Sequence, residues 1–346
     1  MDDLPMLCID KVNISDSVES VVDVDVIKAN GFILVGITST GSGNIVISGR
    51  LSYHHSFLTV INRQGRQIRH NKICTVKGSS LYPNRHCAAL SRDKIASVCE
   101  SNQVGVYNIH DGSFTQKNIT SLFGAINTVD RKYASCITTD PIRGHIIVGT
   151  RNIGSLFIFD EELNFIRALK LPEVIKWSRD ILYHEGVLLI CHLEGSCACA
   201  VTMDTSNTEA ELLYELRKPD IDGKTWYPLS ICKDRTGFVY ILWSSNDQCT
   251  GQGVITQYNQ DGQQLLTTKR TEDGARCMTT LMTEEGEKLL VATSESRNML
   301  CYGLEVRSQY GVCDVIWANA LWKLYLGYYN ILVDLSLKPD SFGMFA

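Results

Sequence analysis

The residues best suited to metal chemistry form a short run of cysteine and histidine. Cys191 and His192 are followed by Cys197 and Cys199, and thiolate and imidazole groups are the usual ligands of zinc. In an extended strand Cys197 and Cys199 share one face, whereas Cys191 and His192 point to opposite faces. Because this spacing does not bring four ligands together, we expect buried thiols here, with no metal and no cofactor bound.

Groups suited to hydrolysis are few and scattered. Asp140, Asp180, His184 and Asp234 stand apart in the sequence, and some of them end apolar runs, where acidic residues commonly cap turns. They supply no recognisable carboxylate pair for acid and base roles. Phosphate-loop, dinucleotide-binding, nucleophile-elbow and HExxH motifs do not occur in the chain. We therefore expect no catalytic residue and no enzyme activity, and a hydrolase is kept as the second rival interpretation.

The elements that must position these residues repeat about every fifty residues. Six short apolar runs, rich in Val and Ile, begin 49, 52, 41, 52 and 50 residues apart. A period of this size built from short strands is typical of a propeller. The six runs are NIVISG (44–49), DKIASVC (93–99), HIIVGT (145–150), GVLLICH (186–192), FVYILWS (238–244) and KLLVAT (288–293).

Each apolar run has a short strand before it, and most lead into a hairpin after it. The Gly-containing pairs Gln64-Gly65, Asp111-Gly112 and Asp261-Gly262 supply the positive φ that tight hairpin turns require. The sixth unit lacks an outer strand, whereas VVDVDVI (21–27) shows the alternation of a half-exposed strand. We expect it to pair near 298–306 and close the ring, because closure removes exposed edges.

The sequence thus predicts an all-β six-bladed β-propeller closed by an N-terminal strand. We expect an N-terminal extension (1–19), the propeller (20–306) and a C-terminal helical tail (307–346). In that tail Trp317, Leu321, Leu324 and Tyr328 follow a helical spacing. Docking on the propeller or on a partner, contact with a membrane, and a non-native extension are alternatives that the sequence leaves open.

The order of strands and turns resembles that of NHL-type propellers, especially those that end invertebrate tripartite-motif (TRIM) proteins. The resemblance covers roughly residues 20–306 and implies a protein-binding or an RNA-binding propeller. No RING or B-box cysteine-histidine pattern precedes it, so ubiquitin-ligase activity is not carried over. The matching segments are FLTVINRQGRQIR (57–69), VGVYNIHDG (104–112), SLFIFDEELNFIR (155–167) and VITQYNQDGQQLL (254–266).

Composition and charge indicate the class of protein, its compartment and its partners. The chain has 346 residues, of which 44% are hydrophobic and 21% charged, as in ordinary globular proteins. Its acidic start lacks the pattern of a signal peptide, and its thirteen cysteines are too sparse for a disulfide scaffold. We expect a cytoplasmic protein that does not have a membrane as its partner; the oligomeric state stays open.

A basic segment motivates the first rival, an RNA-binding propeller. Residues 50–94 hold nine basic residues and one acidic residue, while the whole chain carries a net charge of −5. Such a block focuses positive potential on one sector. RNA readers also interleave stacking aromatics with basic groups, and only Tyr53 and Tyr82 lie nearby. A solvated face or an acidic protein partner explains the same pattern.

The favoured interpretation is a scaffold that binds a protein or peptide through its long loops. Connections between blades, and between the second and third strands of each blade, emerge on the same side of a propeller, and here they are long and varied. Trp, Tyr and Arg in such loops commonly anchor interfaces, although tryptophans that pack between blades are the competing explanation. The predicted partner-binding residues are Tyr53, His54, His55, Tyr82, Arg85, His86, Arg151, Trp177, Arg179, Trp226 and Trp243.

Overall fold

A computed structural model gives the fold of the chain, which divides into two compact units. The first comprises Met1–Val12 with Glu305–Ala346, and the second is Asn13–Leu304. All six sheets described below belong to the second unit, apart from the ends of β1 and β25. The structure describes residues 11–14, 20–22, 32–51, 55–62, 67–75, 87–99, 102–123, 133–203, 207–246, 251–271, 274–283, 286–293 and 299–307.

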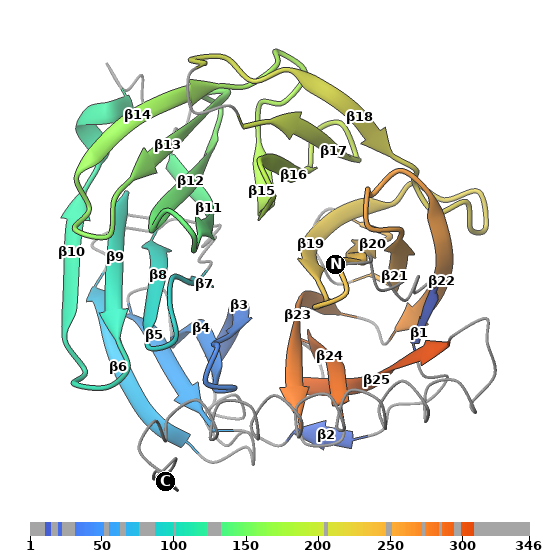
Figure 1. Ribbon diagram of the computed structural model, residues 1–346, viewed down its shortest axis with the longest axis horizontal. Helices are drawn as coiled ribbons and strands as arrows, with labels where there is room; N and C mark the ends of the chain where they lie inside the picture. The colour runs from blue at the N-terminus through green and yellow to red at the C-terminus, as the bar shows by residue number, and fades with distance from the viewer. Residues whose placement is uncertain are drawn as a thin grey trace, which may run out of the picture. The chain divides into compact units, whose positions relative to one another are not determined.

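Six antiparallel sheets follow one another along the chain, as predicted from the fifty-residue repeat (Figure 1). Blade 1 comprises β3 (Phe32–Ser39), β4 (Ile45–Leu51), β5 (His55–Ile61) and β6 (Gln67–Thr75). Blade 2 comprises β7 (Cys87–Ala89), β8 (Lys94–Cys99), β9 (Gln103–Asn108) and β10 (Phe114–Asn118), followed by the short 3-10 helix η1 (Thr120–Phe123). Blade 3 comprises β11 (Tyr133–Asp140), β12 (His145–Arg151), β13 (Ser155–Phe159) and β14 (Phe165–Lys170).

The second half of the chain repeats this arrangement. Blade 4 comprises β15 (Ser178–His184), β16 (Val187–His192), β17 (Cys197–Thr202) and β18 (Leu212–Leu216). Blade 5 comprises β19 (Tyr227–Lys233), β20 (Val239–Ser244), β21 (Gly253–Tyr258) and β22 (Leu265–Thr271). Blade 6 comprises β23 (Ala275–Thr283), β24 (Gly286–Thr293) and β25 (Met299–Arg307), with β1 (Lys11–Ile14) and β2 (Ser20–Val22) along β25.

The first strands of the six sheets contact one another in a circle. Contacts run from β3 to β7, β11, β15, β19 and β23, and from β23 back to β3. The chain is therefore an all-β six-bladed propeller. The end of each sheet that carries the turns between second and third strands and the connections between blades is called the long-loop face, and the opposite end the turn face.

A bulge recurs near the start of five inner strands. The register against the second strand shifts between Leu34 and Gly36, and the same shift occurs in β11, β15, β19 and β23. An extra residue of this kind bends the strand and increases its twist. Polar bonds then join neighbouring inner strands: the Ile231 N–H donates to Asp180 Oδ2 at 3.0 Å, and the Met278 N–H donates to Ser230 Oγ at 3.3 Å.

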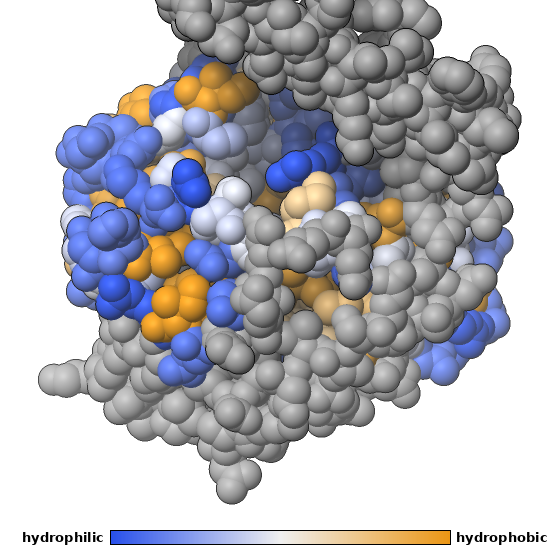
Figure 2. All heavy atoms as spheres, turned by 60° about the horizontal axis from the view of Figure 1, so that its bottom comes forward, coloured by the Kyte–Doolittle hydropathy of each residue, from blue (hydrophilic) through white to orange (hydrophobic). Residues whose placement is uncertain are grey.

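The core lies between the blades. Buried branched side chains of adjacent sheets form clusters such as that of Ile147, Ile158, Ile181 and Leu188 between blades 3 and 4. On the outside, the view in Figure 2 shows hydrophobic side chains in small areas among hydrophilic ones. Two exposed apolar side chains stand out at opposite ends of the sheets, Val174 with 62% of its surface exposed and Ile142 with 91%.

The sixth sheet is where the sequence predicted closure by an N-terminal strand. The structure pairs β2 with β25, Ser20 opposite Cys301 and Val22 opposite Met299. Residues 23–27 of the predicted strand lie outside the described residues, so closure over its full length stays a prediction. The helical tail predicted for 307–346 also lies outside them, apart from Arg307. Among the described residues, no helix is both long and apolar enough to cross a membrane.

Candidate functional site

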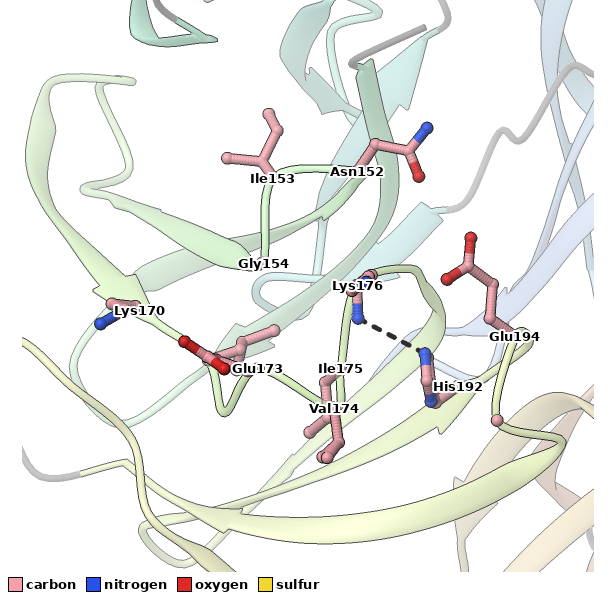
Figure 3. Close-up of a pocket in the computed structure, with 12 residues that line it drawn as sticks. Asn152, Ile153, Gly154, Lys170, Glu173, Val174, Ile175, Lys176, His192 and Glu194 are labelled. Atoms are coloured by element: carbon pink, nitrogen blue, oxygen red, sulfur yellow. Dashed lines mark hydrogen bonds between the residues drawn. The ribbon is translucent and has the colours of Figure 1, made fainter. Parts of the chain in front are cut away.

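A groove opens on the long-loop face between blades 3 and 4 (Figure 3). Its volume is about 980 Å³, which lies at the upper end of the range for ligand sites. Three segments that are distant in sequence form its walls: the β12–β13 turn, the β14–β15 connection and the β16–β17 turn. The lining residues are Asn152, Ile153, Gly154, Lys170, Leu171, Glu173, Val174, Ile175, Lys176, His192, Glu194 and Gly195.

Backbone hydrogen bonds hold these three segments together. The Asn152 N–H donates to the Lys176 carbonyl at 2.9 Å, and the Leu171 N–H donates to the Gly154 carbonyl at 2.8 Å. Gly154 has φ of 64°, a backbone conformation that favours glycine. Because the walls are already bonded to one another, little ordering entropy remains to be lost when a ligand enters.

His192 forms part of the groove floor and is 4% exposed. Its Nε2 accepts the Lys176 N–H at 3.4 Å (Figure 3), and its Nδ1 lies 3.8 Å from Cys197 Sγ. An accepting Nε2 places the proton of the neutral ring on Nδ1, which then faces the thiol as a donor. Burial lowers the pKa of His192 and raises that of Cys197, so this pair is a neutral structural contact.

The rim of the groove combines charge with one apolar side chain. Val174 projects from the β14–β15 connection, while Leu171 and Ile175 beneath it are 3% and 1% exposed. Glu173, Lys176 and Glu194 are exposed around it. This arrangement can bury an apolar side chain of a ligand against Val174 and pair charged groups along the edges.

Beside the groove, an arginine stacks on a tryptophan. Arg151 Cζ lies 3.6 Å from the centroid of the Trp177 ring, and Arg151 Nη1 donates to the Tyr133 hydroxyl at 2.7 Å. Arg151 and Trp177 also form an isolated antiparallel bridge. The stack fixes both side chains, and rigid arginine and aromatic groups are favourable interface anchors. Arg179 follows two residues later at the bulge of β15.

Of the residues predicted to bind a partner, three lie near this groove and two lie in the interior. The structure brings Arg151 and Trp177 together and places Arg179 close in sequence to them. Trp226 and Trp243 are 2% and 0% exposed in the cluster between blades 4 and 5. Their indole N–H groups donate to the Ile221 carbonyl and to Thr256 Oγ1. They pack between blades and offer no surface to a partner, which corrects their assignment.

The remaining predicted positions lie between residues 53 and 86 of the sequence. Tyr53, His54, Tyr82, Arg85 and His86 lie outside the described residues. The backbone of His55 is described and begins strand β5, where the sequence interpretation had extended the loop to residue 56. Their part in partner binding stays a prediction.

Two described basic side chains of the 50–94 segment contact neighbouring blades. Arg69 donates to the carbonyls of Ile109 and His110 at 3.1 and 2.8 Å, and Lys94 pairs with Glu161 at 2.7 Å. These contacts lie toward the turn face, opposite the long loops. Whether the segment gathers around Tyr53 and Tyr82, as the RNA interpretation requires, falls outside the described residues.

The cysteines and acids singled out in the sequence have structural contacts. Cys191 and Cys199 are buried thiols whose pKa values burial raises. No cluster of three or more metal-ligating side chains occurs among the residues that the structure describes. Asp140 accepts the N–H groups of Ile142 and Arg143, and Asp234 accepts that of Phe238, as expected of turn acids. Asp180 binds beyond its own strand, because its Oδ2 accepts the Ile231 N–H of blade 5.

Sequence reasoning missed most of the groove, including Val174, His192 and the 152–154 turn. A signal was present: the β14–β15 connection, LPEVIKWSR, belongs to the long loops and carries two charged and two branched residues between Pro172 and Trp177. The hydrogen bonds that join this connection to two turns of other strands could not be predicted from the sequence, because they depend on tertiary structure.

Comparison with known proteins gives the fold. No family model matches the chain, and no curated protein sequence matches it. Among solved structures, the β-propeller domain of Cps50 (Swd1) from Myceliophteria thermophila resembles it with a TM-score of 0.53 and 10% identity, over 78% of this chain and 82% of that one. This likeness supports the propeller architecture alone.

Two other solved structures resemble the chain more distantly. A protein of unknown function from Bacteroides caccae matches with a TM-score of 0.47 and 12% identity, over 70% of this chain and 83% of that one. A chain of a nidogen/laminin complex matches with a TM-score of 0.47 and 9% identity, over 70% and 81%.

Proposed function

We propose that this propeller is a non-enzymatic interaction module that binds a peptide segment of a protein partner in the groove between blades 3 and 4. The observation that carries the proposal is the preformed groove itself. Its walls are joined by direct backbone bonds, its floor of Leu171, Ile175 and His192 is buried, and its rim exposes Val174. The adjacent Arg151–Trp177 stack supplies a rigid anchor next to this apolar contact.

The shape and the lining favour a peptide over a small molecule. The groove is open along its length and edged by Glu173, Lys176 and Glu194, so it presents charges of both signs. An extended peptide can place successive side chains against the apolar and the charged parts of such a surface. The resemblance to NHL-type propellers, which rests on the segments quoted above, agrees with a binding role, and a cytoplasmic location remains part of the same proposal.

Selection of a displayed random-peptide library on the full chain tests this function. Val174→Asp places a charge where the apolar contact is proposed, so it is expected to weaken a selected peptide by about tenfold or more, equivalent to ~1.4 kcal/mol. Because Val174 is 62% exposed, the variant is expected to keep its melting temperature.

Ile142→Asp is the matched control, since Ile142 is 91% exposed on the turn face. It is expected to leave the affinity of the same peptide unchanged. Selection of no peptide, or equal weakening by both substitutions, refutes the proposed groove.

A further inference from the structure

A second cavity, separate from the groove, lies at the centre of the propeller. Its volume is about 440 Å³, and all six inner strands line it. Apolar side chains such as Ile37, Ile137 and Met278 contribute to its wall together with the hydroxyl groups of several threonines. Toward the turn face, the lining includes one amine, that of Lys233, and one carboxylate, that of Glu185. The cavity is large enough for a small molecule.

Lys233 is held in place by its backbone. It pairs with Val239 of β20, and its carbonyl accepts the Thr280 hydroxyl of the next blade at 3.0 Å. His184 is likewise fixed as the last residue of β15, where Glu185 and Gly186 form a tight turn with φ of 51° and 85°. Between these two strands, Lys233 Nζ lies 2.6 Å from His184 Nδ1. An ammonium Nζ can only donate to Nδ1, and the ring proton then sits on Nε2.

Lys233 differs from two described lysines that form ion pairs. Lys94 and Lys170 pair with Glu161 and Glu209, and these carboxylates raise their pKa values. Lys233 has no carboxylate within 4.0 Å among the described residues, and burial lowers its pKa, with Glu185 acting in the opposite direction. More of this amine is therefore neutral near pH 7 than in an exposed lysine.

The charged groups around Lys233 come from three elements. His184 ends β15, and its pKa is lowered by burial and by Lys233 itself. Asp234 follows Lys233 but accepts the Tyr240 hydroxyl at 2.8 Å, and Glu287 of β24 accepts the Arg235 N–H at 3.0 Å. Both carboxylates are thus engaged elsewhere. An amine beside a neutral imidazole, at the wall of a cavity, is the arrangement of a nucleophilic lysine.

We propose that Lys233 forms a Schiff base with a small aldehyde or ketone that enters the central cavity. The Nζ lone pair attacks the carbonyl carbon, the C=O π bond breaks, and the oxygen takes up a proton from solvent to give a carbinolamine once Nζ has lost a proton. His184 accepts the proton that Nζ loses and returns it to the departing hydroxyl, which leaves as water as the C=N bond forms. The reaction is stoichiometric and independent of the proposed peptide groove.

Reductive trapping tests this proposal directly. The full chain is treated at pH 7 with a small aliphatic aldehyde and cyanoborohydride, which converts a Schiff base into a stable secondary amine, and modified lysines are mapped by mass spectrometry at early times. Lys233 is expected to be labelled at least about tenfold faster than the exposed Lys176 and Lys218. Labelling of Lys233 no faster than these two lysines overturns the proposal.

Two variants separate the roles of the dyad. Lys233→Met is expected to remove the fast phase of labelling, whereas Lys218→Met leaves it intact. His184→Phe keeps a ring of similar size but lacks the accepting nitrogen, so it is expected to slow labelling of Lys233 while that of Lys176 stays the same. If His184→Phe keeps the melting temperature and the fast rate, the role of the imidazole as proton acceptor is refuted.

Discussion

The β15–β16 hairpin carries a histidine near each end, and the two have different roles. His192 ends β16 at the long-loop face, where its Nε2 accepts a backbone N–H and holds the β14–β15 connection. His184 ends β15 at the turn face, where its Nδ1 faces the Lys233 amine. Burial lowers the pKa of both rings. Burial therefore favours the neutral form of the histidine at either end of the hairpin. The hydrogen-bond partner decides whether the ring supports a loop or accepts a proton.

The two ends also differ in how their surfaces are built. At the long-loop face, three segments bond to one another through backbone groups and form a groove. At the turn face, acidic residues such as Asp140 and Asp234 bind the N–H groups of their own tight turns. Binding of an extended ligand in a preformed groove is therefore expected at the first face, and a small fixed site at the second. Three pairs of substitutions test this difference between the two faces.

The largest effect is expected where a predicted surface tryptophan proved to be interior. Trp243→Ala removes a side chain that is 0% exposed and is expected to cost about 3–5 kcal/mol of folding stability. Trp177→Ala, at the groove, leaves the core between blades 4 and 5 intact and is expected to cost much less while weakening peptide binding. Thermal unfolding followed by circular dichroism measures both, and similar losses in the two variants contradict this division.

The next effect concerns Asp180, which lies between the two ends and joins blades 4 and 5. Burial raises its pKa from 3.8 to about 6. The folded state then binds the proton more readily than the unfolded state, so this group makes the protein more stable as the pH falls from 6 toward 3.8. Above pH 6 the buried charge costs on the order of 3 kcal/mol relative to an exposed carboxylate.

Asp180→Asn removes this titration. The variant is expected to lack the gain in stability that the wild type shows on acidification through this window, and urea unfolding at several pH values measures the difference. Glu185→Gln, at the rim of the central cavity that Asp180 also lines, serves as the control. It is expected to keep the gain in stability on acidification. If Asp180→Asn and the wild type show the same slope, the buried carboxylate is not its source.

The architecture was accessible to sequence reasoning because local signals agreed with it. Short Val- and Ile-rich runs at nearly fixed spacing gave six sheets, and Gly112 and Gly262 adopt the positive φ that their turn pairs predicted. Sequence patterns could not place the side chains of Trp226 and Trp243, because a tryptophan at the end of a loop gives the same sequence signal whether it faces solvent or the next blade. The bulges of the inner strands and the Lys233–His184 contact likewise depend on pairing between distant segments, which no local pattern records.

The smallest effect is expected at His192, and it tests the difference in role between His192 and His184. His192→Phe leaves the Lys176 N–H without its acceptor, and because that bond is long, at 3.4 Å, a loss of about 1 kcal/mol is expected. In the wild type, protonation of His192 turns Nε2 from acceptor into donor. Since the folded pKa is lowered, this contribution is present above about pH 6.5 and is lost as the pH falls further.

Peptide affinity and aldehyde labelling, measured on the same two variants, resolve the two histidines. His192→Phe is expected to weaken groove binding and to make it insensitive to acidification, while labelling of Lys233 is unchanged. His184→Phe is expected to do the reverse. Because both rings titrate in the same direction, pH dependence alone does not distinguish them, whereas the crossed pattern of binding and labelling does. Weakened peptide binding in the His184 variant would mean that the hairpin transmits changes from one face to the other, and the two ends would then form one site.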